Sequence, residues 1–293
     1  MNKNILQLIA GLFLCACVTS CQKELIATPD PVPPPVITLH DSVTRLSQLI
    51  FIDTYVSATD TTGYYEYLYD NLQRVTTINI YDYYNSPSIP TVFTFYYSGS
   101  DSLSYKMTEE GTHSSDTYSY TTFYFYDNLQ RLIKDSAIYG PDVYVYKYNY
   151  SNTMITTRGS FVYNNDLANP YLEADTGFIG STGDVIKTNS LTLNNEDYVN
   201  NFTYDDKPNP FSQLNIHTTY NPMPGFNFYL YDFLLQKNNT ILATEENQLY
   251  PGTITTTTYS YTYNALGLPE TVNISDQDGP TSEPRILFLY KKI

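Results

Sequence analysis

The sequence has few of the residues from which catalytic and metal sites are usually built. It contains three histidines and no tryptophan in 293 residues. All of its cysteines, Cys15, Cys17 and Cys21, lie close to the N-terminus. The rest of the chain therefore has no thiol for a disulfide, a catalytic nucleophile or a thiolate metal site.

Positive charge is also scarce. There are 15 Lys and Arg against 30 Asp and Glu, a formal net charge of −15, and the basic residues form no run along the sequence. Affinity for nucleic acid comes from clustered Lys and Arg, so we expect no nucleic-acid partner. With 42% hydrophobic and 15% charged residues, the composition excludes a charge-rich disordered chain and suits one large domain or two small ones.

The N-terminus has the pattern of an export signal. Lys3 precedes an apolar run from Ile5 to Val18, which is too short to cross a hydrocarbon core of about 30 Å. The following Val-Thr-Ser-Cys resembles a bacterial lipobox. The resemblance implies cleavage after residue 20 and a diacylglyceryl group on the Cys21 thiol, which would hold the protein to a membrane. The alternative is an ordinary secretory signal with an incidental cysteine.

Residues 21–39 are predicted to form a tether. Five prolines lie between Pro29 and Pro35, which favours a semi-rigid polyproline-II spacer of about 3 Å per residue. Lys23-Glu24 is a partial match to the surface-export signal of Bacteroidetes-type lipoproteins. We expect an outer-membrane lipoprotein, with the cell-surface and periplasmic faces both open.

Residues 40–293 are predicted to form a single β domain, because alternation with a period of two recurs along them. In the segment 144–150, Tyr144, Tyr146, Tyr148 and Tyr150 alternate with Val, Lys and Asn. Side chains two residues apart in a strand share one face of the sheet. Each such segment therefore presents a column of tyrosines on one face.

The turns between these segments repeat as well. Residues 67–75 match residues 124–132, with Tyr-Asp-Asn-Leu-Gln-Arg identical, and residues 261–269 form a looser third copy. Asp, Asn and Gly suit tight hairpin turns. The sequence therefore predicts an all-β fold, an antiparallel meander of repeated hairpins with about a dozen strands in a strongly curved sheet or open barrel.

These copies resemble the YD, or RHS-type, repeat Tyr-x-Tyr-Asp-x-x-Gly-Arg-Leu. Gln73 and Gln130 replace its glycine, whereas the third copy keeps Gly267 but has Asn264 for the Asp. With the lipobox and the tether, the chain is similar to Bacteroidetes-type lipoproteins of unknown function with degenerate YD/RHS-like repeats. The shell that long RHS proteins build around a toxin does not carry over, because this chain has too few copies.

Two segments depart from the hairpin pattern. Residues 167–183 contain Asn-Pro and several glycines and are predicted to form a long loop. Residues 226–235 are aromatic and aliphatic with little alternation. They are consistent with one short helix or a buried strand, and we favour the helix.

The candidates for chemistry are few. A hydrolase could use carboxylates or a lone histidine, His113 or His217, but no Gly-x-Ser-x-Gly elbow occurs. We expect no cofactor and no metal, although acidic pairs leave calcium open. These pairs are 109–110, 205–206 and 276–278.

The tyrosine columns are the remaining signal. They would stabilise a sheet by cross-strand packing, and an exposed column could also bind a ligand. If one face stays open, Tyr144, Tyr146 and Tyr148 are the candidate ligand-facing residues. The leading hypothesis is a non-enzymatic binding or structural module of the envelope, with a glycan, envelope polymer or protein as partner. The alternatives are a surface or periplasmic hydrolase and an accessory subunit of an outer-membrane assembly.

Overall fold

The computed structural model describes residues 43–53, 60–82, 89–113, 116–162, 171–191, 197–214, 216, 236–275 and 286–293. The chain divides into two units, Met1–Val36 and Ile37–Ile293, and all of these residues belong to the second. The first half of the second unit contains β1 Thr44–Asp53, β2 Asp60–Tyr69, β3 Val75–Asp82, β4 Thr91–Tyr96, β5 Lys106–His113, β6 Asp116–Tyr126, β7 Leu132–Tyr139 and β8 Asp142–Tyr150. The second half contains β9 Met154–Val162, β10 Tyr171–Ile179, β11 Val185–Leu191, β12 Asp197–Pro208, the 3₁₀ helix η1 Pro210–Gln213, β13 Asn238–Asn247, β14 Ile254–Tyr263, β15 Pro269–Ser275 and β16 Ile286–Lys292.

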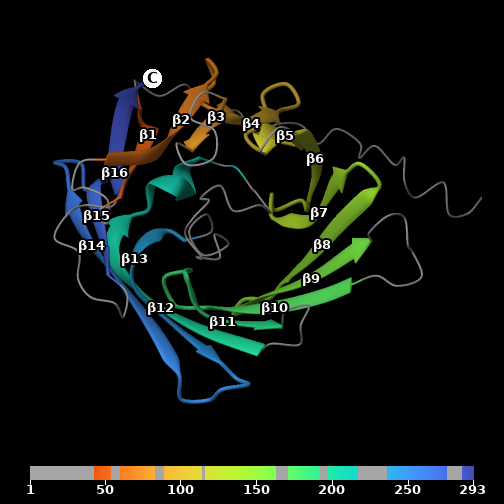
Figure 1. Cartoon of the computed structure of the whole chain (residues 1–293), viewed down its shortest axis with the longest axis vertical. Helices are drawn as coiled ribbons and strands as arrows, with labels where there is room; N and C mark the ends of the chain where they lie inside the picture. The colour runs from red at the N-terminus through yellow and green to blue at the C-terminus, as the bar shows by residue number, and fades with distance from the viewer. Residues whose placement is uncertain are drawn as a thin grey trace, which may run out of the picture. The chain divides into compact units, whose positions relative to one another are not determined.

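The strands form a closed antiparallel barrel in which each strand pairs with the next, and β1 pairs with β16 (Figure 1). Backbone hydrogen bonds between Val43 and Ile293 complete this seam. The predicted all-β hairpin meander is confirmed. The barrel has more strands than the dozen expected and is closed rather than open. Closure pairs the backbone groups that an edge strand would leave exposed, and strand-by-strand alternation cannot show it.

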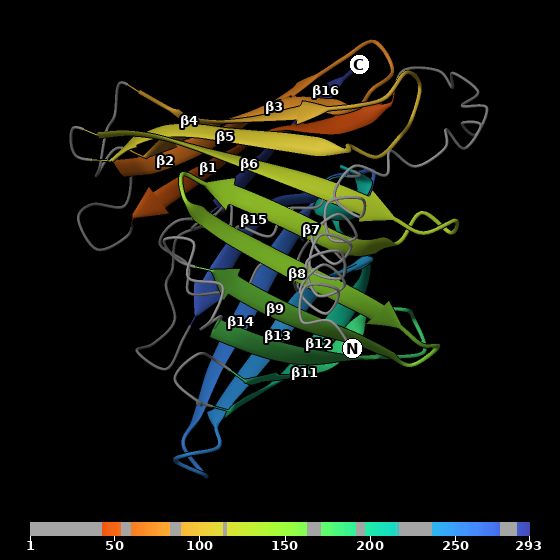
Figure 2. The same cartoon turned by 90° about the vertical axis from the view of Figure 1, so that its right-hand side faces the viewer.

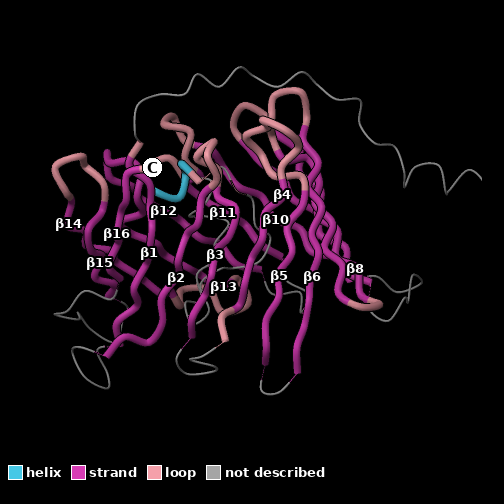
Figure 3. Tube along the Cα trace, turned by 90° about the horizontal axis from the view of Figure 1, so that it is seen from above, coloured by secondary structure: helices cyan, strands magenta, loops and turns pink. Residues whose placement is uncertain are grey.

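The barrel has two different rims. Even-numbered strands end, and odd-numbered strands begin, at the rim that we call the turn rim; the opposite end is the loop rim. Because the number of strands is even, the first and last strands bring both Val43 and Ile293 to the turn rim. Figure 3 shows the C-terminus at the same edge as the β4–β5 and β14–β15 connections. Figure 2 shows the strands and hairpin turns from the side.

Alternate side chains fill the inside of the barrel. The buried cluster contains residues of β1–β8, residues of β14–β16 and Phe211 of η1. The ring of Phe211 lies 6.3 Å from that of Phe288. Such a cluster can form only on the concave face, so the buried face of each strand is the inner one. Tyr65, Tyr67 and Ile78 are among its members, each at most 3% exposed.

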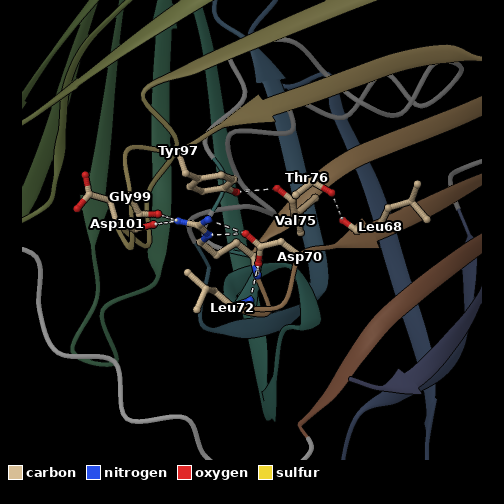
Figure 4. A network of polar contacts seen from close by, with 9 residues as sticks. Leu68, Asp70, Leu72, Val75, Thr76, Tyr97, Gly99 and Asp101 are labelled. Atoms are coloured by element: carbon tan, nitrogen blue, oxygen red, sulfur yellow. Dashed lines mark hydrogen bonds and ion pairs between the residues drawn. The ribbon is translucent and has the colours of Figure 1, made fainter.

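The repeated turns explain the Tyr-Asp motif. One carboxylate oxygen of Asp70 accepts hydrogen bonds from the backbone N–H groups of Leu72 and Arg74, and the other pairs with the Arg74 guanidinium at 2.6 Å (Figure 4). Asp127 makes the same contacts with Leu129 and Arg131. An aspartate at this position therefore satisfies the turn backbone that the ladder leaves unpaired.

The turns also require one left-handed residue. Gln73 and Gln130 have φ angles of 63° and 61°, and Gly267 has 75° in the third copy. These are the positions where the YD pattern has glycine, the residue that adopts this conformation at no steric cost. The two glutamines therefore keep the turn shape at some cost in backbone strain.

The predicted long loop at 167–183 is wrong over most of its length. Residues 171–179 form β10, and its partners β9 and β11 lie on either side. Gly177 faces inward beneath Val185, so a residue that usually weakens a strand is accommodated by packing. The predicted short helix at 226–235 lies outside the described residues. The described part of the chain contains no helix long and apolar enough to cross a membrane.

Candidate functional site

The tyrosine column of β8 points into the barrel. Tyr148 is 8% exposed, and its hydroxyl donates a hydrogen bond of 2.7 Å to Oδ2 of Asp135 on β7. Tyr146 pairs in register with Asp135, and Tyr144 with Ala137. The three candidate ligand-facing residues thus share one inner face. Tyr148 belongs to the core, whereas Tyr144 and Tyr146 are only partly buried.

Two carboxyl groups are deeply buried on this side of the barrel. Asp135 has no exposed surface, and burial raises its pKa to about 7 despite the Tyr148 hydrogen bond. Its Oδ1 has no hydrogen-bond partner among the described residues. Glu109 on β5 is 3% exposed, and burial raises its pKa to about 7 against the opposing effect of a hydrogen bond from Tyr118. Both groups therefore gain protons close to neutral pH.

These two carboxyl groups do not form a facing pair. Glu109 is level with Tyr120 on β6, whereas Asp135 is level with Tyr124. The two carboxyl groups are therefore offset by four residues along the strands, which corresponds to about 13 Å. They also lie on either side of β6, with a strand spacing of about 4.8 Å on each side. Each carboxyl group instead has its own tyrosine partner. This arrangement gives no support to a hydrolase that would need two opposed carboxylates.

The inner face becomes more polar around β10–β13. Asp175, Ser190, Asn200 and Glu245 occupy inner positions there by register. Burial raises the pKa of Asp175, which Ser190 partly offsets by a hydrogen bond, and burial also raises the pKa of Glu245. The interior thus has an apolar sector and a polar, acidic sector.

The histidine candidates are not brought together. His113 ends β5 at the loop rim, where it pairs in register with Asp116. His217 and His40 lie outside the described residues. The hydrolase alternative therefore gains no assembled triad from the described part of the chain.

The calcium candidates gain no support either. In the described ranges, no group of three or more His, Cys, Asp or Glu is placed to hold a metal ion. Glu109 is buried in the barrel while its neighbour Glu110 is exposed, so this pair is split between two faces. Asp205 accepts hydrogen bonds from Lys207 N, Asn239 N and the Tyr263 hydroxyl. The segment 276–278 lies outside the described residues.

A second set of tyrosines ties neighbouring hairpins together at the turn rim. In each case a tyrosine toward or just beyond the end of an even-numbered strand donates from its hydroxyl to a backbone carbonyl near the start of the preceding odd-numbered strand. We call these bonds the tyrosine latches. They are Tyr69 to Leu46, Tyr97 to Val75, Tyr126 to Ser104, Tyr150 to Leu132, Tyr204 to Val185 and Tyr290 to Pro269. The latches give these six tyrosines a structural role.

The outer wall is largely polar. On β2 and β3, outward Glu66 and Asn79 are hydrogen-bonded at 3.0 Å. On β14, exposed Thr258 and Ser260 flank buried Tyr259. Lys134, Lys147 and Arg158 are register partners on β7, β8 and β9, next to inward Asp135, Tyr148 and Gly159. Apolar outward residues such as Phe125 and Ile138, 38% and 40% exposed, stand among these polar groups.

Two solved structures from Bacteroides are similar to this chain. A porin-like protein from Bacteroides vulgatus ATCC 8482 matches with a TM-score of 0.54 and 9% identity, over 85% of this chain and 99% of that one. A porin-like protein from Bacteroides uniformis ATCC 8492 matches with a TM-score of 0.36 and 12% identity, over 84% and 96%. No protein-family profile and no curated protein matches. The first similarity concerns the fold alone.

Proposed function

We propose that this chain is a lipid-anchored, non-enzymatic binding or structural module of the bacterial outer membrane, whose barrel stands in water beside the membrane. The anchor is the expected lipid on Cys21. The ligand classes are those of the envelope, a glycan, an envelope polymer or a protein partner.

The observation that carries this proposal is the chemistry of the outer wall. A barrel that crosses a membrane presents an apolar band about 25 Å tall to the lipid. Here the outward positions of β14 are Thr256, Thr258, Ser260 and Thr262, and charged Glu66, Lys147 and Arg158 stand near the middle of other strands. Charged groups at such positions would cost about 2–4 kcal/mol each at a bilayer midplane.

The barrel interior also differs from that of an aqueous channel. Channel-forming barrels have a polar, water-filled lumen. In this barrel the buried apolar cluster extends over β1–β8, η1 and β14–β16. The polar sector, with Asp175 and Glu245, is the part of the inner face suited to a polar ligand. Partly buried Tyr144 and Tyr146 lie on β8, which β9 separates from this sector.

The anchor is tested by metabolic labelling with an alkyne-bearing fatty acid. We expect label on the wild-type chain and its loss in Cys21→Ala. Cys17→Ala is the matched control and should keep the label, because that residue would be removed with the signal. Label that persists in Cys21→Ala would refute the anchor.

The environment of the barrel is tested by protease treatment of intact and lysed cells. Shaving of intact cells places the barrel on the cell surface, and cleavage only after lysis places it in the periplasm. Both outcomes fit the proposal. A barrel that resists protease after lysis, and that requires detergent to stay folded after removal of the lipid, would show that the wall lies in the bilayer.

A further inference from the structure

Most of the described basic residues of the barrel are gathered at one end. Twelve of the 15 Lys and Arg are described, and Lys3, Lys23 and Arg285 are not. Lys147 and Arg158 are the fourth and fifth residues of their strands counted from the turn rim. The other ten all lie at the turn rim, either in a turn or within three residues of a strand end. They are Arg45, Arg74, Lys106, Arg131, Lys134, Lys187, Lys207, Lys237, Lys291 and Lys292.

The loop rim has the opposite charge. Its described residues include no Lys or Arg, and six strands begin or end there on an aspartate. These are Asp53, Asp60, Asp82, Asp116, Asp142 and Asp197. Glu245 and Glu246 lie next to the loop-rim end of β13. Within the described residues, a chain with a formal charge of −15 therefore concentrates its positive charge on one rim.

Several acidic residues of the turn rim are already neutralised or occupied. Asp70, Asp127 and Asp206 form ion pairs with Arg74, Arg131 and Lys207. Asp184 is fully buried and accepts hydrogen bonds from the backbone of residues 237 and 238. Among the described residues, Lys134, Lys187 and Lys292 of the same rim enter no such ion pair. Their positive charge is therefore available to an anionic partner.

The turn tips at this rim also present apolar side chains. Leu129 and Leu266 occupy the same position in two of the repeated turns and are 66% and 65% exposed. Exposed apolar tips in front of basic residues are the combination that binds the interface of an anionic bilayer. Val43, through which the chain enters the barrel, lies at this rim, 22 residues after Cys21.

We propose that the turn rim is a docking surface for an anionic lipid bilayer, which orients the barrel with its acidic loop rim away from the membrane. This inference rests on the proposed lipid anchor. The anchor alone holds the barrel near the membrane on a tether, whereas docking sets which end faces it. Each basic side chain near an anionic surface contributes about fivefold to the docking equilibrium, and removal of three should weaken docking roughly a hundredfold.

The absence of tryptophan from the chain allows a direct test. The lipidated full chain would carry Leu266→Trp at the turn rim or, as a matched control, Tyr250→Trp, a 67% exposed tip at the loop rim. Each variant is reconstituted in vesicles of phosphatidylcholine with brominated acyl chains, with and without phosphatidylglycerol. Bromine quenches tryptophan fluorescence only at close approach.

We expect quenching of Leu266→Trp in the anionic vesicles alone, reversed by high salt because exposed charges are screened. The combined Lys134→Gln, Lys187→Gln and Lys292→Gln substitutions should abolish it, whereas Lys134→Arg with Lys187→Arg should keep it. Equal quenching in both lipids, quenching of Tyr250→Trp instead, or quenching that survives the three glutamine substitutions would overturn the proposal. So would a response of Leu266→Trp to soluble polygalacturonate but to no vesicle.

The two proposals fail in different ways. Flotation with neutral vesicles at high salt reports the lipid anchor and does not depend on the turn rim. A chain that floats without quenching in anionic vesicles has an anchor but no docking surface. A chain that fails to float in neutral vesicles, yet is recruited and quenched by anionic ones, lacks the anchor and keeps the docking surface.

Discussion

At the scale of single residues, the repeated turns show how one backbone angle decides residue choice. Gln73 and Gln130 adopt the left-handed conformation that Gly267 adopts in the third copy. For an L-residue this conformation costs about 1–2 kcal/mol. The hydrogen bonds of Asp70 and Asp127 to the turn backbone hold the glutamines in place.

Replacing such a glutamine by glycine should stabilise the barrel. We expect Gln130→Gly to raise the free energy of unfolding by about 0.5–1 kcal/mol. The relief of backbone strain in the folded state outweighs the stabilisation that glycine gives the unfolded chain through its greater conformational entropy. Gly267→Gln is the converse control and should lower it, although a Cβ there meets no atom closer than 3.9 Å. Urea denaturation of the purified chain measures both. Unchanged midpoints in the two variants would contradict the strain argument.

The buried carboxyl group of Asp135 makes stability depend on pH. Its pKa is about 7 in the folded barrel and near 3.9 when unfolded. Between these values the folded state binds the extra proton, so the stability present at low pH is lost as the pH rises toward 7.

Asp135→Asn should remove this dependence while keeping the Tyr148 contact. We expect the variant to gain stability over the wild type by a few kcal/mol as the pH rises from about 4 to about 7. The free energies of unfolding across this range measure the effect. Glu110→Gln, on the exposed neighbour of Glu109, is the control and should follow the wild type. Parallel pH profiles for Asp135→Asn and the wild type would contradict the burial argument.

At the scale of elements, the hairpin is the repeating unit and the tyrosine latches join neighbouring hairpins at the turn rim. The sequence predicted the strands, the turns and the shared tyrosine face, because alternation and turn residues are local signals. It did not predict the latches, because the acceptor is a backbone carbonyl about 20 residues away that only the pairing register identifies. It also missed β10, because Gly177 and the glycines that follow the strand imitate a loop.

Removing one latch should destabilise the barrel measurably. Tyr150→Phe deletes the hydrogen bond to the Leu132 carbonyl, 2.8 Å long, and keeps the ring near the Arg131 guanidinium. We expect a loss of about 1 kcal/mol in the free energy of unfolding. Tyr250→Phe, on an exposed tip, should stay within about 0.5 kcal/mol of the wild type. The latch has no energetic role if the two variants unfold at the same urea concentration.

At the scale of the whole molecule, the outward side chains of the barrel determine whether its wall is suited to water or to lipid. The porin-like neighbour shares the architecture, but the outward side chains of this chain are polar or charged at many mid-strand positions. Because inner and outer residues alternate along every strand, the same sequence specifies a tyrosine-rich interior and an outer wall with many polar positions.

A charge added to the outer wall should therefore be tolerated. Thr258→Arg, at an exposed position of β14, should change the free energy of unfolding by no more than about 0.5 kcal/mol. At a bilayer midplane it would cost about 2–4 kcal/mol. Thr257→Arg, at the buried position next to it, should prevent stable folding. Circular dichroism and urea denaturation without detergent distinguish these outcomes. A severe loss in Thr258→Arg would indicate that the wall faces lipid.

The sequence alone determined the all-β meander, the tyrosine face and the turn positions, since each depends on residues that are near neighbours in the chain. The tertiary structure decided the closure of β1 on β16, the burial of Asp135 and the separation of charge between the rims. Arg45, Lys187 and Lys292 are far apart in sequence, so no run of basic residues stands out. The alternating direction of the strands returns the chain to the same rim every two strands, and this periodic return gathers scattered charges into one surface.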